Sequence, residues 1–104
     1  MDGIAIDEME RKAPAAAAFL KGLASPHRLM ILCQLAQGEA SVSVLIDATG
    51  IQPTSMSQHL AKLKEEGIVA VRRDHRTLFY RIEHPATLAI MAVLYDNFCK
   101  EPDQ

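Results

Sequence analysis

The fold class is decided by the stretch SVSVLIDATGIQPTSMSQHLAKLKEEG, residues 41–67, because its pattern predicts two helices separated by a very short turn. Ser41 can accept a hydrogen bond from an unpaired backbone amide, so we predict that it caps a short helix running through Asp47. The apolar face of this helix is formed by Val42, Leu45 and Ile46. Gly50 ends the helix, since glycine readily adopts the left-handed conformation found at helix ends.

The second half of the stretch has the spacing of an amphipathic helix. Pro53 can begin this helix because the first helical residue needs no amide partner. Large apolar side chains then recur at i, i+4 and i+7, namely Met56, Leu60 and Leu63. Gly67 ends the helix. Two helices joined by a turn of a few residues predict a helix-turn-helix.

Beyond Gly67 the apolar pattern changes from helical to alternating. Residues 68–73 and 77–82 are rich in β-branched and aromatic side chains, which favour strands. The two segments are joined by Asp74-His75-Arg76. We therefore predict a β-hairpin with a basic tip directly after the helix-turn-helix.

Two more helices precede this motif. Residues 7–23 predict an alanine-rich helix, and Ser25 followed by proline predicts the start of another over residues 26–37, stopped by Gly38. The run Leu29-Met30-Ile31-Leu32-Cys33 is apolar on most sides of that second helix. We therefore expect the helix to be central and buried, with Cys33 inside.

A last helix begins at Pro85 and leaves few polar positions before Cys99. A chain of 104 residues is too small to bury this helix and the first one alone, so we expect a partner subunit. The pattern as a whole predicts one domain over residues 1–104. Its fold class is mainly α with a small β-hairpin, a homodimeric winged helix-turn-helix that dimerises through its first and last helices.

The net charge of −2 is the sum of a basic middle segment and two acidic flanks. Residues 51–82 carry six Lys or Arg against three Asp or Glu, a net charge of +3, and also two histidines. Residues 1–50 and 83–104 have net charges of −2 and −3. A surface that faces phosphates must therefore come from the middle of the chain.

Polar side chains on the second motif helix are candidates for DNA recognition. Ser55, Gln58 and Lys62 point away from its apolar stripe, with Thr54 beside them. Hydroxyl and amide groups can read base edges in a major groove, and cations can hold phosphates, also from the hairpin tip. The predicted DNA contacts are Thr54, Ser55, Ser57, Gln58, His59, Lys62, Arg72, Arg73, His75 and Arg76.

Each of these features also has a purely structural interpretation. Outward polar residues are the default for an amphipathic helix, and a charged hairpin tip prevents edge-to-edge aggregation. A protein-interaction module with this fold would show no salt-dependent DNA binding. Catalysis is not indicated, because the chain has no Gly-rich phosphate loop, no convincing Cys/His dyad and no metal-ligand spacing.

Three short motifs connect this pattern to a known family. They are Ala24-Ser25-Pro26-His27-Arg28-Leu29, Ser57-Gln58-His59-Leu60, and Gly67-Ile68-Val69 leading into Arg72-Arg73. Through them the sequence resembles the ArsR/SmtB family of bacterial repressors. The resemblance implies one recognition helix and one wing per subunit of a dimer on a pseudopalindromic double-stranded operator. Pro53 departs from the family, where a polar residue is common at this position.

The metal sites of this family are not expected in the sequence, and no cofactor is implied. The thiolate metalloid sensors carry Cys-x-Cys where this chain has Ser41-Val42-Ser43, and hydroxyls are poor ligands for soft metals. The zinc-sensing branch needs a histidine on the last helix, but residues 85–104 contain none. The four histidines, His27, His59, His75 and His84, have no ligand-like spacing.

Cys33 and Cys99 resemble the cysteine pair of the persulfide-sensing branch that includes SqrR, BigR and HlyU. The resemblance implies that a disulfide or polysulfide bridge between them lowers operator affinity in response to reactive sulfur species. Two alternatives remain open, a metalloid sensor that uses both thiolates as ligands and a repressor whose cysteines are structural.

The cellular compartment bears on these thiols. Residues 1–12 include four acidic residues and no apolar signal-peptide core. The longest apolar run, Leu88 to Tyr95, is far shorter than a membrane span. We therefore expect a cytoplasmic protein without membrane association, in which free thiols or a redox pair are favoured over a permanent disulfide.

Overall fold

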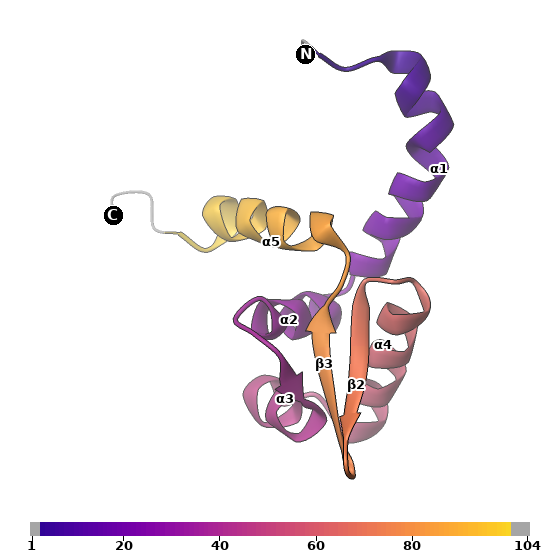
Figure 1. Ribbon diagram of the computed structural model, residues 1–104. Coiled ribbons are helices and arrows are strands. Elements are labelled where there is room, and N and C mark those ends of the chain that lie inside the picture. Colours follow the sequence, from indigo (N-terminus) through magenta and orange to yellow (C-terminus); the bar gives the residue numbers. More distant parts are fainter. Residues whose placement is uncertain (1–2, 101–104) are drawn as a thin grey trace.

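The computed structural model describes residues 3–100, and this range contains five helices and three strands (Figure 1). In chain order the elements are α1 (Ile6–Leu23), α2 (Pro26–Leu35), β1 (Ala40–Ser41), α3 (Val42–Thr49), α4 (Pro53–Glu65), β2 (Val69–Asp74), β3 (Thr77–Ile82) and α5 (Pro85–Phe98). The predicted order of four helices, a hairpin and a last helix is confirmed, with one short strand added. Within residues 3–100 no helix combines the length and apolarity needed to cross a membrane.

The helix ends follow the predicted capping signals. Ser25 Oγ accepts a hydrogen bond from the Arg28 amide at 3.3 Å, and Ser41 Oγ accepts one from the Val44 amide at 3.3 Å. Each bond satisfies an amide that has no partner inside its own helix. Gly50 ends α3 in the left-handed conformation, with φ 73°. These local signals keep the turn between α3 and α4 short.

One hydrophobic core holds α2, α3, α4 and the sheet together. The predicted stripe on α4, formed by Met56, Leu60 and Leu63, is fully buried. It belongs to one cluster with Ile31 of α2 and Leu45 of α3. Full burial of a side chain of this size contributes about 1.5–3 kcal/mol relative to exposure. The core therefore fixes which side of α4 faces solvent.

The sheet has the strand order β1-β3-β2, and both pairs are antiparallel. The hairpin pairs Val69 with Ile82 and Asp74 with Thr77, so its tip is the two-residue turn of His75 and Arg76. His75 adopts φ 59°, a left-handed conformation that histidine tolerates better than a β-branched residue would. The two-residue strand β1 was not predicted, because a segment this short shows no alternation.

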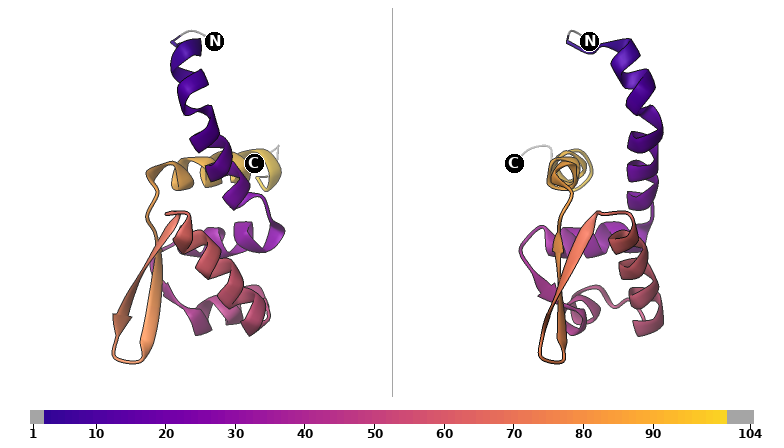
Figure 2. Two further views of the ribbon diagram at one scale, coloured as in Figure 1. Left: turned by 90° about the vertical axis from the view of Figure 1, so that its right-hand side faces the viewer. Right: turned by 45° about the vertical axis from the view of Figure 1, so that its right-hand side comes forward.

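Helices α1 and α5 project from the compact body, although Leu23 of α1 and Met91 of α5 join its core (Figure 1 and Figure 2). α1 extends away from the end of the body where α4 leads into β2, and α5 lies across that end. Both helices expose large apolar side chains, which are Ile6, Met9, Leu20, Leu88, Val93, Tyr95 and Phe98. This exposure agrees with the prediction that one chain cannot bury both helices alone.

The expected burial of Cys33 is wrong. Cys33 is exposed, although Ile31 and Leu32 beside it are fully buried. A continuous apolar run places apolar residues on every side of a helix, but only one side of α2 packs against the core. Its other side faces α5 across an open groove, and Cys33 lies there.

Candidate functional site

The solvent-facing side of α4 is polar and accessible. Thr54, Ser57, Gln58 and Lys62 are exposed. Ser55 is half-buried, so it lies further from solvent than the helical pattern predicts. Short polar side chains on one face of an otherwise core-packed helix can reach base edges and phosphates. Their contacts with DNA stay a prediction.

His59 belongs to a hydrogen-bonded network inside the subunit. Its Nδ1 accepts a hydrogen bond from Arg28 Nε at 3.2 Å, and Arg28 also donates to the Gly22 carbonyl at 3.1 Å. Burial lowers the pKa of His59, and the neighbouring Arg28 and His27 lower it further. The imidazole is therefore neutral at pH 7, and the nitrogen that faces Arg28 is not available to a base.

Arg72 is held by an acidic partner rather than left free on the wing. Its guanidinium makes three hydrogen bonds of 2.8–3.0 Å to the Glu39 carboxylate and lies 4.5 Å from the centre of the Phe79 ring. The hydrogen bonds from Arg72 lower the pKa of Glu39. A bidentate pair of this kind neutralises the charge that the sequence assigned to DNA. Arg72 therefore anchors β2 to the segment before β1.

Two cations at or beside the hairpin tip are free of such partners among the described residues. Within residues 3–100, Arg73 and Arg76 have no ion pair, and both are exposed. His75 is also exposed, and its Nδ1 lies 2.8 Å from the Asp74 carboxylate. The tip can therefore present two unpaired guanidinium groups to a phosphate backbone.

The structure brings Cys33 and Cys99 to one groove. The groove lies between α2 and α5, has a volume of about 340 Å³, and is lined by apolar side chains. Cys33 comes from the third turn of α2, and Cys99 is the residue that caps the C-terminus of α5. Both are free thiols exposed to solvent. Residues 66 positions apart in sequence thus share one surface hollow.

The side chains that could bind a metal ion are not arranged as a metal site in the described residues. Across residues 3–100, no three His, Cys, Asp or Glu side chains are grouped so that they could hold a metal ion. Ser41 and Ser43 face each other at 3.3 Å between their hydroxyl oxygens, and Ser41 also caps α3. His84 caps α5 through its Nδ1, which accepts from the Ala86 amide at 3.1 Å.

A helix-turn-helix followed by a hairpin, flanked by two helices with apolar faces, defines the winged helix-turn-helix class of regulators. Residues 25–71 match the family described as "Bacterial regulatory protein, arsR family". The transcriptional activator HlyU of Vibrio cholerae serotype O1 is 34% identical over 95 residues, which are 91% of this chain and 88% of HlyU. The chain therefore belongs to the ArsR family, whose members are DNA-binding transcriptional regulators.

Solved structures agree with this assignment. The crystal structure of the transcriptional repressor BigR from Xylella fastidiosa has a TM-score of 0.88 and 38% identity, covering 94% of this chain and 100% of that one. The homodimeric winged helix-turn-helix domain of Mb0332 from Mycobacterium bovis has a TM-score of 0.75 and 34% identity, covering 93% of this chain and 89% of that one. The predicted resemblance to the BigR and HlyU branch is confirmed.

Two residues that hold the predicted DNA-contact residues in place, Glu39 and Arg28, were not identified from the sequence. Glu39 neutralises Arg72 across 33 positions, and Arg28 joins α2 to His59 across 31. Neither pair has a local signal, because the partners come from different elements. Glu39 lies in the loop between the end of α2 and β1, where the neighbouring sequence offers it no basic partner.

Proposed function

We propose that this protein is a homodimeric transcriptional repressor controlled by its two cysteines. The reduced dimer binds operator DNA through α4 and the wing. It is released when Cys33 and Cys99 of one subunit form a disulfide or polysulfide bridge. The observation that carries this proposal is that both thiols are exposed on one groove between α2 and α5.

The dimer is supported by the apolar surface that the subunit leaves uncovered. Leu88, Val93 and Tyr95 of α5 are each more than half exposed, and Ile6 of α1 is 77% exposed. Covering such a surface with a second copy removes it from water, at roughly 25 cal/mol per Å² of apolar area. We propose that residues 1–104 act as one domain whose first and last helices form this interface.

DNA binding is supported by the surface that stays polar. Thr54, Ser57 and Gln58 face solvent on α4, and Arg73 and Arg76 stand unpaired on the wing among the described residues. In a dimer, two such surfaces would meet successive major grooves of one duplex. The base contacts would come from α4, and the wing would add phosphate contacts.

The bridge can form by thiol–persulfide exchange without a further oxidant. The Cys33 thiolate attacks the outer sulfur of an organic persulfide and becomes a persulfide, while the donor leaves as a thiol. The Cys99 thiolate then attacks the Cys33 sulfur and expels hydrosulfide, which leaves a disulfide. If a second donor first lengthens the Cys33 chain by one sulfur, attack on the middle sulfur closes a trisulfide instead. We place this reaction in the cytoplasm, where thiols are otherwise kept reduced.

The bridge would act on DNA binding through α5. It ties α5, part of the proposed interface, to α2, which packs in the same core as α4. A small rotation of one subunit against the other would change the spacing of the two recognition helices. Operator affinity would fall because both helices could no longer enter successive grooves together.

Intact mass spectrometry tests the thiol chemistry directly. The reduced protein is treated in parallel with an organic persulfide, hydrogen peroxide and arsenite, with Cys33→Ser and Cys99→Ser as controls. A bridge between the two cysteines of one subunit, formed with the persulfide, supports the proposal. Retained arsenite would instead identify a metalloid sensor with a third ligand from the partner. No modification would make both cysteines structural.

A further inference from the structure

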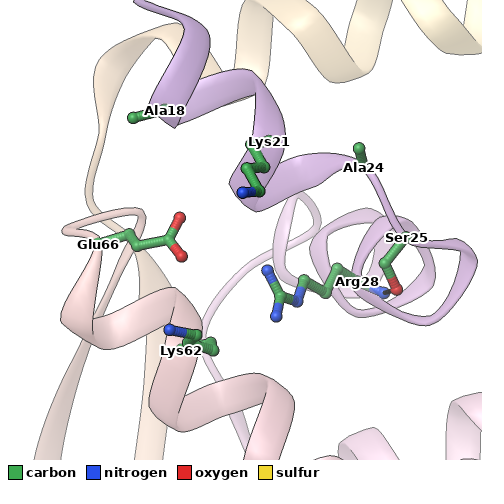
Figure 3. A pocket seen from close by; sticks show the side chains of 7 residues that line it. All are labelled: Ala18, Lys21, Ala24, Ser25, Arg28, Lys62 and Glu66. Carbon is green, nitrogen blue, oxygen red and sulfur yellow. Dashed lines mark hydrogen bonds between the residues drawn. The ribbon is translucent and has the colours of Figure 1, made fainter. Parts of the chain in front are cut away.

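A second hollow, lined by charged rather than apolar side chains, lies where α1, α2 and α4 meet. We call it the α1–α2–α4 notch; its volume is about 610 Å³. Its charged residues are Lys21 from α1, Arg28 from α2, and Lys62 and Glu66 from the end of α4. Figure 3 shows Arg28 and Glu66 extending toward the middle of the notch from different walls. Three cations against one carboxylate leave a net charge of +2.

Most of these charges have no ion-pair partner among the described residues. Among residues 3–100, Lys21, Arg28 and Glu66 form no ion pair, and Lys62 pairs only with Glu65 at 3.3 Å. Arg28 is half-buried and held in place by the Gly22 carbonyl and His59. Its two hydrogen bonds use two of its five N–H donors, so the fixed guanidinium can still donate to a ligand.

The local field at this place is positive. Three cations line the notch against one carboxylate, and Lys21 and Arg28 have no acidic partner among residues 3–100. An anion would be favoured by the same field. Lys62 extends this positive surface onto the solvent-facing side of α4, where the predicted base-reading residues lie.

The notch and the hairpin tip lie toward opposite ends of the body. Figure 1 shows the loop from α4 to β2 near α1, whereas the hairpin tip is at the far end. A helix in a major groove about 12 Å wide has a phosphate backbone on each side. Because Lys62 lines the notch and is also exposed on the polar side of α4, a backbone that runs beside α4 can reach the notch.

From this arrangement we infer that the α1–α2–α4 notch binds a phosphate group through Lys21, Arg28 and Lys62, and that in the working repressor this is a phosphate of the DNA backbone. The inference rests on the proposed DNA-binding function. The contact is independent of base sequence, since only charge and donors are involved. The Glu66 carboxylate repels the phosphate and so weakens this contact.

The test compares two changes of opposite sign in the full-length dimer. Lys21→Gln removes a cation from the notch, and Glu66→Gln removes its only acid. Lys12→Gln is the matched control, because it makes the same charge change in α1 outside the notch. Affinity is measured between low and moderate salt on a duplex that the protein selects from a randomised pool, and on a random duplex of equal length.

We expect Lys21→Gln to weaken binding to both duplexes on the order of fivefold and to reduce the slope of log affinity against log salt by about one per notch. Glu66→Gln should tighten binding. If these residues only stabilised the fold, neither change would raise DNA affinity. Opposite effects of Lys21→Gln and Glu66→Gln on affinity therefore distinguish a DNA contact from a structural role. Equal effects of Lys21→Gln and Lys12→Gln would overturn the DNA contact.

A second arm separates DNA phosphate from a free phosphate. Inorganic phosphate and a nucleoside diphosphate are titrated into the DNA-free protein while amide resonances near the notch are followed. Saturable shifts that Lys21→Gln abolishes, with DNA affinity unchanged, would support the phosphate site but assign it to a small ligand. No shifts and no DNA effect would overturn the inference. A protein that selects no duplex at all would instead contradict the proposed function.

Discussion

Arg28 Nε donates a hydrogen bond of 3.2 Å to His59 Nδ1 and so joins the start of α2 to the middle of α4. This bond requires that Nδ1 carry no proton. Burial, and the neighbouring Arg28 and His27, lower the pKa of His59, which favours the neutral ring. The position of α4 is therefore coupled to the protonation of one of its own side chains.

Acidification is expected to destabilise the protein through His59. The folded-state pKa lies below the unfolded value of about 6.5, so the contribution to stability is complete above that pH and is lost as the pH falls below it. Denaturant unfolding at pH 7.5, 6.5 and 5.5 measures it. His59→Gln should flatten this dependence, with exposed His75→Gln as the control. Equal slopes in the wild type and His59→Gln would contradict the coupling.

The wing cations are expected to contribute unequally to DNA affinity. Arg73→Ala or Arg76→Ala should weaken binding and reduce the salt slope by about one per subunit, since each loses an unpaired guanidinium. Arg72→Ala should change the slope less, because Glu39 already neutralises that charge. Fluorescence anisotropy over a salt series measures all three. A larger slope change for Arg72→Ala than for Arg73→Ala would reverse our interpretation of the wing.

Loss of either thiol is expected to abolish the sulfur response while leaving DNA binding intact. Cys33→Ser and Cys99→Ser keep the size of the side chain but cannot form the bridge, and neither residue lies on the polar side of α4. Operator binding is measured before and after treatment with an organic persulfide. Wild type should lose affinity, and both variants should keep it. A variant that still responds would remove its cysteine from the sensor.

Gly22→Ala is expected to destabilise the fold, unlike most such changes in helices. Replacing glycine by alanine within a helix usually stabilises by about 0.5–1 kcal/mol. Here a Cβ would lie 2.7 Å from Cδ1 of Ile68, which is fully buried and has little room to move, whereas the Glu66 carboxylate that it would also meet is exposed and can turn away. We expect a loss of about 1–2 kcal/mol in the free energy of unfolding.

The contact with Ile68 can be isolated by a double-mutant cycle. Ile68→Val removes the Cδ1 atom that the new Cβ would meet. In that background Gly22→Ala should therefore cost less than in the wild type. An equal cost in both backgrounds, measured by urea denaturation, would show that Ile68 is not the obstacle.

A charge on the apolar face of α5 is expected to break the dimer. Leu88 is 51% exposed in the subunit, so Leu88→Glu should leave the monomer folded while it places a carboxylate in the interface. Asn97→Glu adds the same charge at an exposed polar position of the same helix. Sedimentation equilibrium should show a dimer for the wild type and Asn97→Glu, and a monomer for Leu88→Glu. A monomeric wild type would contradict the dimer itself.

Much of the fold could be predicted because its signals are local. Ser25, Ser41 and Gly50 mark helix ends through bonds or conformations that involve residues within three or four positions. The spacing of Met56, Leu60 and Leu63 identifies the buried side of α4 without knowledge of its partners. Element types and the polar face of the recognition helix therefore followed from the sequence.

The burial of Cys33 and the availability of Arg72 could not be predicted in this way. Both depend on which element lies opposite, α5 in the first case and the Glu39 segment in the second. An apolar run does not say which of its sides meets the core. A charge run does not say which of its members is already paired.

The sequence by itself determined the order and approximate extent of the five helices and the hairpin, which face of α4 is polar, and where positive charge collects. Only the tertiary structure decided that Cys33 and Cys99 share a groove, that Arg72 is neutralised, and that Lys21 joins Arg28 and Lys62 in one notch. The physical reason is the range of the interactions. Caps, turns and periodicity act over a few residues, whereas a groove or a charged notch exists only after distant helices have packed against each other.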